Sequence, residues 1–198
     1  MKLVLASGNP GKLRELDALL GPRGFELVAQ SALGIESPPE AGTTFEENAL
    51  IKARHAARCS GFAALADDSG IEVDALGGRP GVHSARYAGE GATDQQNLEK
   101  LLEELRGVPA ERRTARYRCV IVLVRDADDP APIVARGTWE GRILEAPRGS
   151  GGFGYDPIFL PAGLDRTAAE LSPAEKNAIS HRGLALAALL TELSAARV

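Results

Sequence analysis

The sequence predicts an α/β protein in which helices flank a mixed central β-sheet. Its first residues pass from the apolar run 3–6 through a glycine-containing turn at 7–12 into a helix at 13–20 whose leucines share one face. Later, the long apolar segment 114–125 and the segment 133–139 flank a turn rich in Asp, a pattern typical of a β-hairpin. Strand–helix alternation favours parallel strand pairs and a hairpin adds an antiparallel pair, so the sheet is expected to be mixed.

The other elements are predicted from caps, breakers and periodicity. Thr44 and Glu47 have the spacing of a capping box, and Ser172 followed by Pro173 is a second strong helix start. Gly61 is expected to end the helix that Thr44 begins. The predicted strands are 25–28, 62–66, 71–76 and 141–144, and the predicted helices are 44–59, 93–105 and one running from 172 towards 193.

Composition narrows the class of protein. A chain of 198 residues is long enough for one well-buried domain or for two small lobes that share a sheet. The net charge of −4 argues against a broad nucleic-acid surface, although a few basic residues in one cleft would suffice for a nucleotide. Cys59 and Cys119 form no CxxC pair and lie among apolar neighbours, so we expect buried free thiols in a reducing cytoplasm. No signal peptide is recognised, and the longest apolar run, 184–190, is too short to span a bilayer.

The turn Ser7–Lys12 is the first candidate site. A strand, a glycine turn and a helix aim backbone N–H groups and the positive end of a helix dipole at one point, where Lys12 adds a full charge. The turn is not a Walker A loop, because Ala6 occupies the required glycine position and Leu13 the required Ser or Thr position. It therefore indicates either a phosphate site of another kind or a plain turn with a surface lysine.

Paired carboxylates provide the second candidate. Asp67 and Asp68 follow the apolar run 62–66, and their mutual repulsion calls for a compensating cation such as Mg²⁺. The alternative is a solvated turn that ends the strand. Glu40, in the loop before the next helix, is placed to share such a metal, while Asn48 and Lys52 lie on one face of that helix.

Two further segments offer groups that would suit a purine. The glycine-rich loop 149–157 carries Phe153, whose ring would stack on a base, although Phe153 and Tyr155 would equally fill the core. Lys176 and the segment Ser180–Gly183 provide hydrogen-bond donors for carbonyl or phosphate oxygens, or else belong to a charged helix face.

In this order, these segments resemble the inosine triphosphate pyrophosphatase family, which hydrolyses non-standard purine nucleoside triphosphates. The likeness covers essentially the whole chain, with Tyr155 standing where some members carry Trp. The matching motifs are Ser7–Lys12, Thr44–Ala49, Ala66–Gly70, Gly81–Tyr87, Gly152–Pro157 and Ser180–Gly183.

The resemblance implies a single domain over residues 1–198, with two lobes enclosing an active-site cleft. It further implies a Mg²⁺-dependent homodimer that cleaves ITP, dITP and XTP to the monophosphate and pyrophosphate, without a nucleic-acid polymer or membrane as partner. By this likeness, Asp68 is the catalytic carboxylate and binds the metal together with Glu40, and Asn48, Lys52 and Asp67 support it. The substrate contacts would come from Ser7, Gly8, Asn9, Pro10, Gly11 and Lys12 for the triphosphate, from Ser69, and from Phe153, Gly154, Tyr155, Asp156, Lys176, His181 and Arg182 for the base.

The expected chemistry follows from these roles. Asp68 would orient or deprotonate a water that attacks the α-phosphorus, and Lys12 and Lys52 would offset the charge that moves onto pyrophosphate. His181 or Arg182 would donate to the 6-oxo group, which adenine lacks. Two other functions stay open: a pyrophosphatase for pyrimidine or modified nucleotides on a similar fold, and a non-enzymatic nucleotide-binding module.

Overall fold

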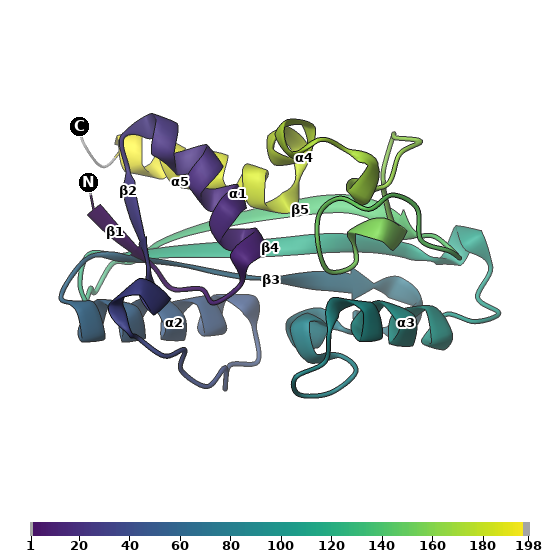
Figure 1. The fold of residues 1–198 in the computed structure, drawn as a ribbon, viewed down its shortest axis with the longest axis horizontal. Helices are drawn as coiled ribbons and strands as arrows, with labels where there is room; N and C mark the ends of the chain where they lie inside the picture. The colour runs from purple at the N-terminus through teal and green to yellow at the C-terminus, as the bar shows by residue number, and fades with distance from the viewer. Residues whose placement is uncertain (1, 196–198) are drawn as a thin grey trace. The chain divides into compact units, whose positions relative to one another are not determined.

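A computed structural model describes residues 2–195 of the chain. The helices and strands are drawn in Figure 1. The strands are β1 (Lys2–Leu5), β2 (Glu26–Ala29), β3 (Ala64–Val73), β4 (Thr114–Val124), β5 (Ile133–Ile143) and β6 (Phe159–Pro161); the helices are α1 (Pro10–Leu20), α2 (Phe45–Ser60), α3 (Asp94–Glu104), α4 (Pro173–Ile179) and α5 (His181–Ala195).

The predicted mixed sheet is confirmed. Its six strands have the order β2-β1-β3-β4-β5-β6. β1 pairs in parallel with both β2 and β3, whereas β5 and β6 are antiparallel. The strand order reverses beside β1, and open α/β sheets bind ligands just outside the carboxyl end of such a switch point. The turn Ser7–Lys12 leaves β1 at that end.

Two compact units make up the chain. Unit 1 comprises residues 1–68, 119–137 and 182–198, and unit 2 comprises residues 69–118 and 138–181. The boundaries fall inside β3, β4 and β5, so each of these strands contributes to both units. The single domain and the cleft between lobes remain predictions.

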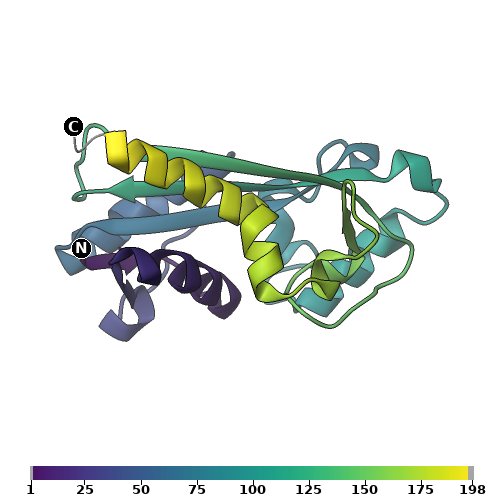
Figure 2. The same cartoon turned by 90° about the horizontal axis from the view of Figure 1, so that it is seen from above.

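Unit 1 has helices on both faces of its strands (Figure 1). Leucines of β1 and β3 pack with apolar side chains of α1 and α5, and α5 lies along the β4–β5 hairpin (Figure 2). The opposite face is covered by α2, whose Ala49, Ala53 and Ala56 are fully buried. Small side chains on that face bring α2 close to the sheet.

Unit 2 has a more aromatic core. Its buried cluster includes Tyr117, Trp139, Tyr155 and Phe159, together with apolar side chains of α3 such as Leu101. The ring centroids of Tyr117 and Phe159 are 4.7 Å apart in an edge-to-face arrangement. The core of this unit is therefore built around large rings whose polar groups need partners.

Two predicted strand boundaries are wrong. One strand, β3 (Ala64–Val73), takes in most of both predicted segments 62–66 and 71–76, while Asp74–Leu76 form a 3-10 helix. The predicted strand 141–144 is the end of β5, which continues to Ile143. Asp67 and Asp68 were expected to end a strand, because Asp, Ser and Gly favour turns. Ion pairs that neutralise both carboxylates allow β3 to continue through them.

Three predicted helix starts and the predicted end of α2 are confirmed, but one predicted helix is interrupted. The capping boxes at Thr44, Thr93 and Ser172 are all present, and Gly61 ends α2 with a φ of 71°. The single helix expected from 172 to about 193 is wrong, because extended backbone at Ser180 (φ −72°, ψ 162°) separates α4 from α5. The expectation of two buried thiols is also half wrong, since Cys119 is buried and Cys59 is exposed.

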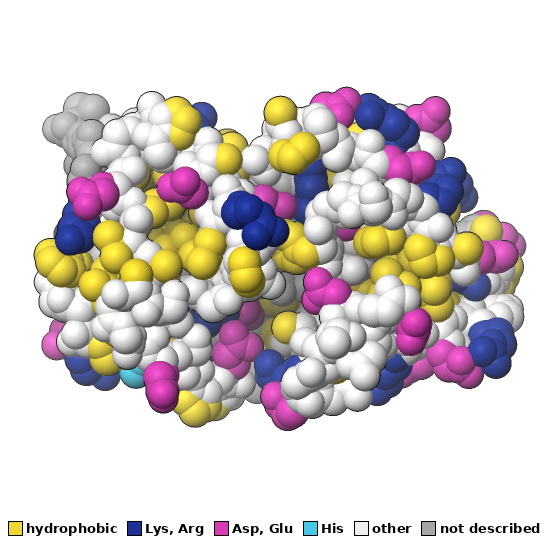
Figure 3. Space-filling model, in the orientation of Figure 1, with side chains coloured by type: hydrophobic (Ala, Val, Ile, Leu, Met, Phe, Trp, Pro, Cys, Tyr) yellow, Lys and Arg dark blue, Asp and Glu magenta, His cyan; other side chains and the backbone are white. Residues whose placement is uncertain are grey.

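The surface carries charges of both signs. On the face shown in Figure 3, Lys and Arg side chains are interspersed with Asp and Glu, and neither sign forms a continuous field. Among residues 2–195, no helix combines the length and apolar character needed to cross a membrane.

Candidate active site

The turn after β1 is held by its own side chains. Asn9 caps α1: its Oδ1 accepts hydrogen bonds from the amides of Gly11 at 2.8 Å and Lys12 at 3.2 Å. Ser7 Oγ accepts from the Asn9 amide at 3.2 Å. The helix therefore begins at Pro10, earlier than predicted. The two amides expected to face a phosphate donate to Asn9 in this structure.

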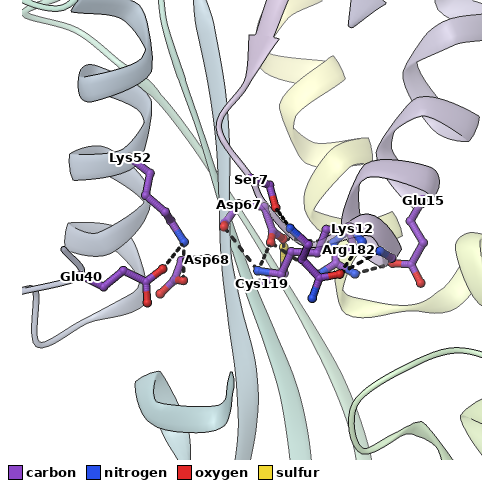
Figure 4. A network of polar contacts seen from close by, with 11 residues as sticks. Ser7, Lys12, Glu15, Glu40, Lys52, Asp67, Asp68, Cys119 and Arg182 are labelled. Atoms are coloured by element: carbon purple, nitrogen blue, oxygen red, sulfur yellow. Dashed lines mark hydrogen bonds and ion pairs between the residues drawn. The ribbon is translucent and has the colours of Figure 1, made fainter. Parts of the chain in front are cut away.

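The two adjacent aspartates point to opposite faces of β3 (Figure 4). Successive strand residues alternate between faces. Leu65 belongs to the core cluster under α1 and α5, so Asp67 faces that side, and Asp68 faces α2. β1 ends at Leu5, which pairs with Leu65, so both carboxylates lie beyond the end of the neighbouring strand. The alternation along β3 therefore separates the two carboxylates.

Asp67 is the centre of a buried ion network. It forms ion pairs with Lys12 and with Arg182, whose Nε lies 3.1 Å from Oδ2. Cys119 donates its thiol proton to Oδ2 at 2.9 Å, and Arg182 forms a second ion pair with Glu15. Burial would raise the pKa of Asp67, but Arg182 and Lys12 outweigh it and hold this pKa well below its usual value. The pKa of the Cys119 thiol is raised by burial and by Asp67.

Asp68 takes part in a separate cluster on the α2 side. Lys52 Nζ lies 2.7 Å from Asp68 Oδ1 and 2.9 Å from Glu40 Oε1. Burial raises the pKa of Asp68 above its ordinary value despite the opposing effect of Lys52 and Lys12. Burial would lower the pKa of Lys52, but the two carboxylates outweigh it and raise this pKa. A carboxylate with a raised pKa is a better proton acceptor than an ordinary one.

Asn48 anchors the loop that brings Glu40 to this cluster. The fully buried Asn48 carbonyl accepts from the amide of Gly42 at 2.8 Å. A Cβ at Gly42 would lie only 2.6 Å from the same oxygen, so this close approach requires glycine. Asn48 and Lys52, which were predicted to share a face of α2, therefore both contact this loop: Asn48 bonds Gly42 and Lys52 pairs with Glu40.

The Glu40–Asp68 pair fits a hard divalent cation. Oδ2 of Asp68 is buried and accepts no hydrogen bond from any residue in the described range 2–195. No group of three or more His, Cys, Asp or Glu in that range is arranged to hold a metal. Mg²⁺ commonly binds through one or two carboxylates plus substrate phosphates and waters, so two carboxylates suffice for it.

In unit 2, Asp156 organises the glycine-rich loop. Its buried carboxylate accepts from Lys176 Nζ at 2.6 Å and from the Phe153 amide at 3.0 Å, both through Oδ2. Tyr117 donates its hydroxyl proton to Oδ1 at 3.1 Å. Lys176 Nζ also lies 4.7 Å from the centroid of the Phe153 ring. One carboxylate thus fixes both the loop and the lysine that covers the aromatic ring.

Three other predicted residues of this half have distinct surroundings. His181 is buried and stacks on Tyr117 with centroids 4.5 Å apart. Tyr155 is part of the core, and its hydroxyl donates to the Ser84 carbonyl at 2.7 Å, which favours the core alternative for its ring. The amide of Gly154 donates to Asp94 at 2.8 Å.

Two independent features require glycine at position 152. Its φ is 70°, and a Cβ there would lie 2.0 Å from Asp156 Oδ2. We expect Gly152→Ala to displace the Asp156 carboxylate and, for the activity that the resemblance implies, to raise the KM for ITP by about tenfold or more, because small displacements in a binding site have large effects. Steady-state kinetics with ITP measure this change.

Gly163→Ala is the matched control for Gly152→Ala. Gly163 also has a positive φ, 79°, but a Cβ there would meet no atom within 4 Å. Both variants carry the cost of about 1–2 kcal/mol for a left-handed non-glycine residue. An equal KM in the two variants would show that contact with Asp156 is unimportant.

The structure brings the predicted residues together in two sets. Unit 1 contains the turn Ser7–Lys12 with the Asp67 network and the Asp68 cluster, and unit 2 contains the loop around Asp156 with Lys176 and His181. Arg182, expected at the base, lies in unit 1 with its guanidinium directed to Asp67 and Glu15. Ser69 follows Asp68 in β3 with a half-buried side chain.

Three network members were not anticipated. Glu15 lies one helical turn after Lys12, a spacing that signals a shared helix face. Cys119 and Tyr117 lie two residues apart on one face of β4 and belong to no local motif, so only the sheet pairing reveals their roles. Cys119 is the buried thiol that its apolar neighbours predict, and it is also a donor to Asp67.

Comparison with known proteins identifies relatives along the whole chain. Residues 3–192 match the sequence model of the Ham1 family. The dITP/XTP pyrophosphatase of Methylococcus capsulatus is 62% identical over 194 residues, which covers 98% of this chain and 96% of that protein. The dITP/XTP pyrophosphatase of Shigella flexneri is 58% identical over 192 residues, covering 97% of this chain and 98% of that protein.

Solved structures have the same fold. A HAM1 protein from Coxiella burnetii superposes with a TM-score of 0.89 at 50% identity, covering 98% of both chains. A nucleoside-triphosphatase / dITP/XTP pyrophosphatase from Mycobacterium abscessus superposes with a TM-score of 0.75 at 49% identity, covering 96% of this chain and 99% of that one. These findings confirm the resemblance drawn from the motifs and the predicted α/β fold.

Proposed function

The chain belongs to the Ham1 family, and from that premise we propose that it hydrolyses non-standard purine nucleoside triphosphates to the monophosphate and pyrophosphate. dITP and XTP are the substrates in the relatives' names, and the resemblance drawn from the motifs adds ITP. The reaction makes the chain a nucleoside-triphosphate pyrophosphatase that removes such nucleotides from the precursor pool.

The observation that carries this proposal is the cluster of Glu40, Lys52 and Asp68. It combines two carboxylates, one buried ammonium and a buried carboxylate oxygen, Oδ2 of Asp68, that no described residue satisfies. A purely structural ion pair would satisfy both oxygens of a buried carboxylate. The orphan oxygen supports a water or metal ligand at this point.

The triphosphate would be held by unit 1. Lys12 supplies positive charge beside the turn, and the positive end of the α1 dipole adds to it. A phosphate oxygen that displaced the Asn9 side chain would gain the amides of Gly11 and Lys12 as donors. Mg²⁺ held by Glu40, Asp68 and the phosphates would supply further charge neutralisation.

Asp68 would act as the base. It accepts a proton from a water that attacks the α-phosphorus, and the bond between that phosphorus and the bridging oxygen breaks to release pyrophosphate. Lys52 offsets the charge that develops on the leaving group. Its raised pKa keeps it protonated for this role.

The purine ring would be bound and recognised by residues of unit 2. Phe153 stacks on the purine, and His181 donates to the 6-oxo group. Adenine carries an amino group at that place and would leave the donor unpaired, at a cost of about 1–3 kcal/mol. Arg182 has its guanidinium on Asp67 and Glu15, which supports His181 as the donor. We also propose a homodimer in the cytoplasm, in line with the family resemblance.

A product assay tests the function. With Mg²⁺, we expect ITP and XTP to yield monophosphate and pyrophosphate in equal amounts, ATP to react far more slowly, and EDTA to remove the activity. Phosphate analysis by chromatography across ITP, XTP, GTP, ATP, dTTP and UTP measures this. Release of orthophosphate without pyrophosphate would contradict the proposal, and a preference for dTTP or UTP would favour the pyrimidine alternative.

A further inference from the structure

Tyr117 contacts two separate parts of the proposed base-reading half. It lies on β4 and is only 7% exposed. Its ring stacks face to face on the imidazole of His181, with centroids 4.5 Å apart and planes 8° from parallel. The Trp139 ring lies nearly parallel to both, at 6.4 Å from Tyr117 and 6.3 Å from His181. The rings of Tyr117 and Trp139 therefore determine the plane of the imidazole.

The hydroxyl of Tyr117 acts on the other part. It donates to Asp156 Oδ1, while Oδ2 of the same carboxylate holds Lys176 and the Phe153 amide. Asp156 is 2% exposed, so its charge depends on these donors instead of on water. Loss of one donor would let the carboxylate turn, and the lysine and the loop would follow it.

We propose that Tyr117 is a positioning residue that couples the orientation of His181 to that of the Asp156 carboxylate, and so sets the discrimination between 6-oxo and 6-amino purines. The inference rests on the proposed function, because it assigns His181 and Phe153 to the base. Tyr117 itself need not touch the nucleotide: its ring orients the donor, and its hydroxyl orients the group that holds Lys176 and Phe153.

Tyr117→Phe isolates the hydroxyl, since it keeps the stacked ring. We expect the KM for ITP to rise by about tenfold, the scale of one lost hydrogen bond to a charged group, with kcat changed far less. The ratio of kcat/KM for ITP to that for ATP should fall by a similar factor. Tyr117→Leu, which also removes the stack, should lower this ratio further.

Tyr87→Phe is the matched control. Tyr87 lies in the same unit, and its hydroxyl also donates to a carboxylate, Glu104 Oε2, at 2.6 Å. The substitution should leave the ITP-to-ATP ratio at the wild-type value. A wild-type ratio in Tyr117→Phe, or an equal fall in Tyr87→Phe, would overturn the inference.

Nucleotide binding without turnover separates this inference from the proposed function. Trp139 is the single tryptophan of the chain and packs beside Tyr117 and His181, so its fluorescence reports on this cluster. Titration with IMP and AMP should show tighter binding of IMP by the wild type, and an IMP affinity about tenfold weaker in Tyr117→Phe. An unchanged IMP affinity would overturn the inference even in an active enzyme. Selective IMP binding that Tyr117→Phe weakens, in a protein that does not hydrolyse ITP, would overturn only the proposed function.

Discussion

Asp68→Asn lowers the kcat for ITP by about 10²–10⁴-fold, the usual contribution of a positioned general base, with a much smaller change in KM. Asparagine keeps the shape of the side chain but does not accept the proton of the attacking water. It also removes the negative charge that, with Glu40, would hold the metal. Steady-state kinetics with ITP and Mg²⁺ measure the effect.

The control for this variant is Asp74→Asn. Asp74 directly follows β3 and pairs at the surface with Arg116, outside the proposed machinery. Its substitution should leave kcat near the wild-type value. Near-normal turnover in Asp68→Asn would remove Asp68 from the central role, and circular dichroism of both variants checks that the fold is retained.

Arg182→Met is expected to have the largest effect on stability. Arg182 is 1% exposed and lies between Asp67 and Glu15. Without it, the buried Asp67 carboxylate loses one of its cationic partners, and removing one member of a buried pair costs about 3–5 kcal/mol. Urea unfolding should show a loss of this size, and Arg182→Lys, which keeps the charge, a smaller one.

Acid unfolding provides a second measure of the same variant. In the wild type, the folded-state pKa of Asp67 lies below its unfolded value, so its stabilising effect is present above the unfolded value and disappears as the pH falls through the folded one. Arg182→Met raises the folded-state pKa, and the acid transition should move to higher pH.

Arg136→Met is the comparison for an exposed pair. Arg136 and its partner Glu46 have side chains that are 57% and 45% exposed. Exposed pairs contribute about 0–1 kcal/mol, so this variant should unfold nearly like the wild type. A free energy of unfolding equal in the two variants would contradict a structural role for Arg182.

The sequence could predict the parts of this protein that local chemistry determines. The strand–turn–helix order, the capping boxes and the hairpin depend on residues that are close in sequence, and so do the motifs around Lys12 and Asp156. The position of Arg182 could not be predicted, because its partners Glu15 and Asp67 are distant in sequence and meet only through the sheet. The continuous β3 was missed for the same reason, since the cations that neutralise its aspartates come from α1, α2 and α5.

The side-to-side alternation along β3 has a consequence for how this site tolerates change. A deletion or insertion of one residue before Asp67 would exchange the environments of the two aspartates, presenting one to Lys52 and the other to Arg182. Leu65 and Ala66 oppose such a change of register, because it would also exchange their faces. Leu65 is buried in the core cluster with α1 and α5, and the small Ala66 is buried on the face that α2 covers. The different sizes of these two apolar side chains thus keep Asp67 directed to Arg182 and Asp68 directed to Lys52.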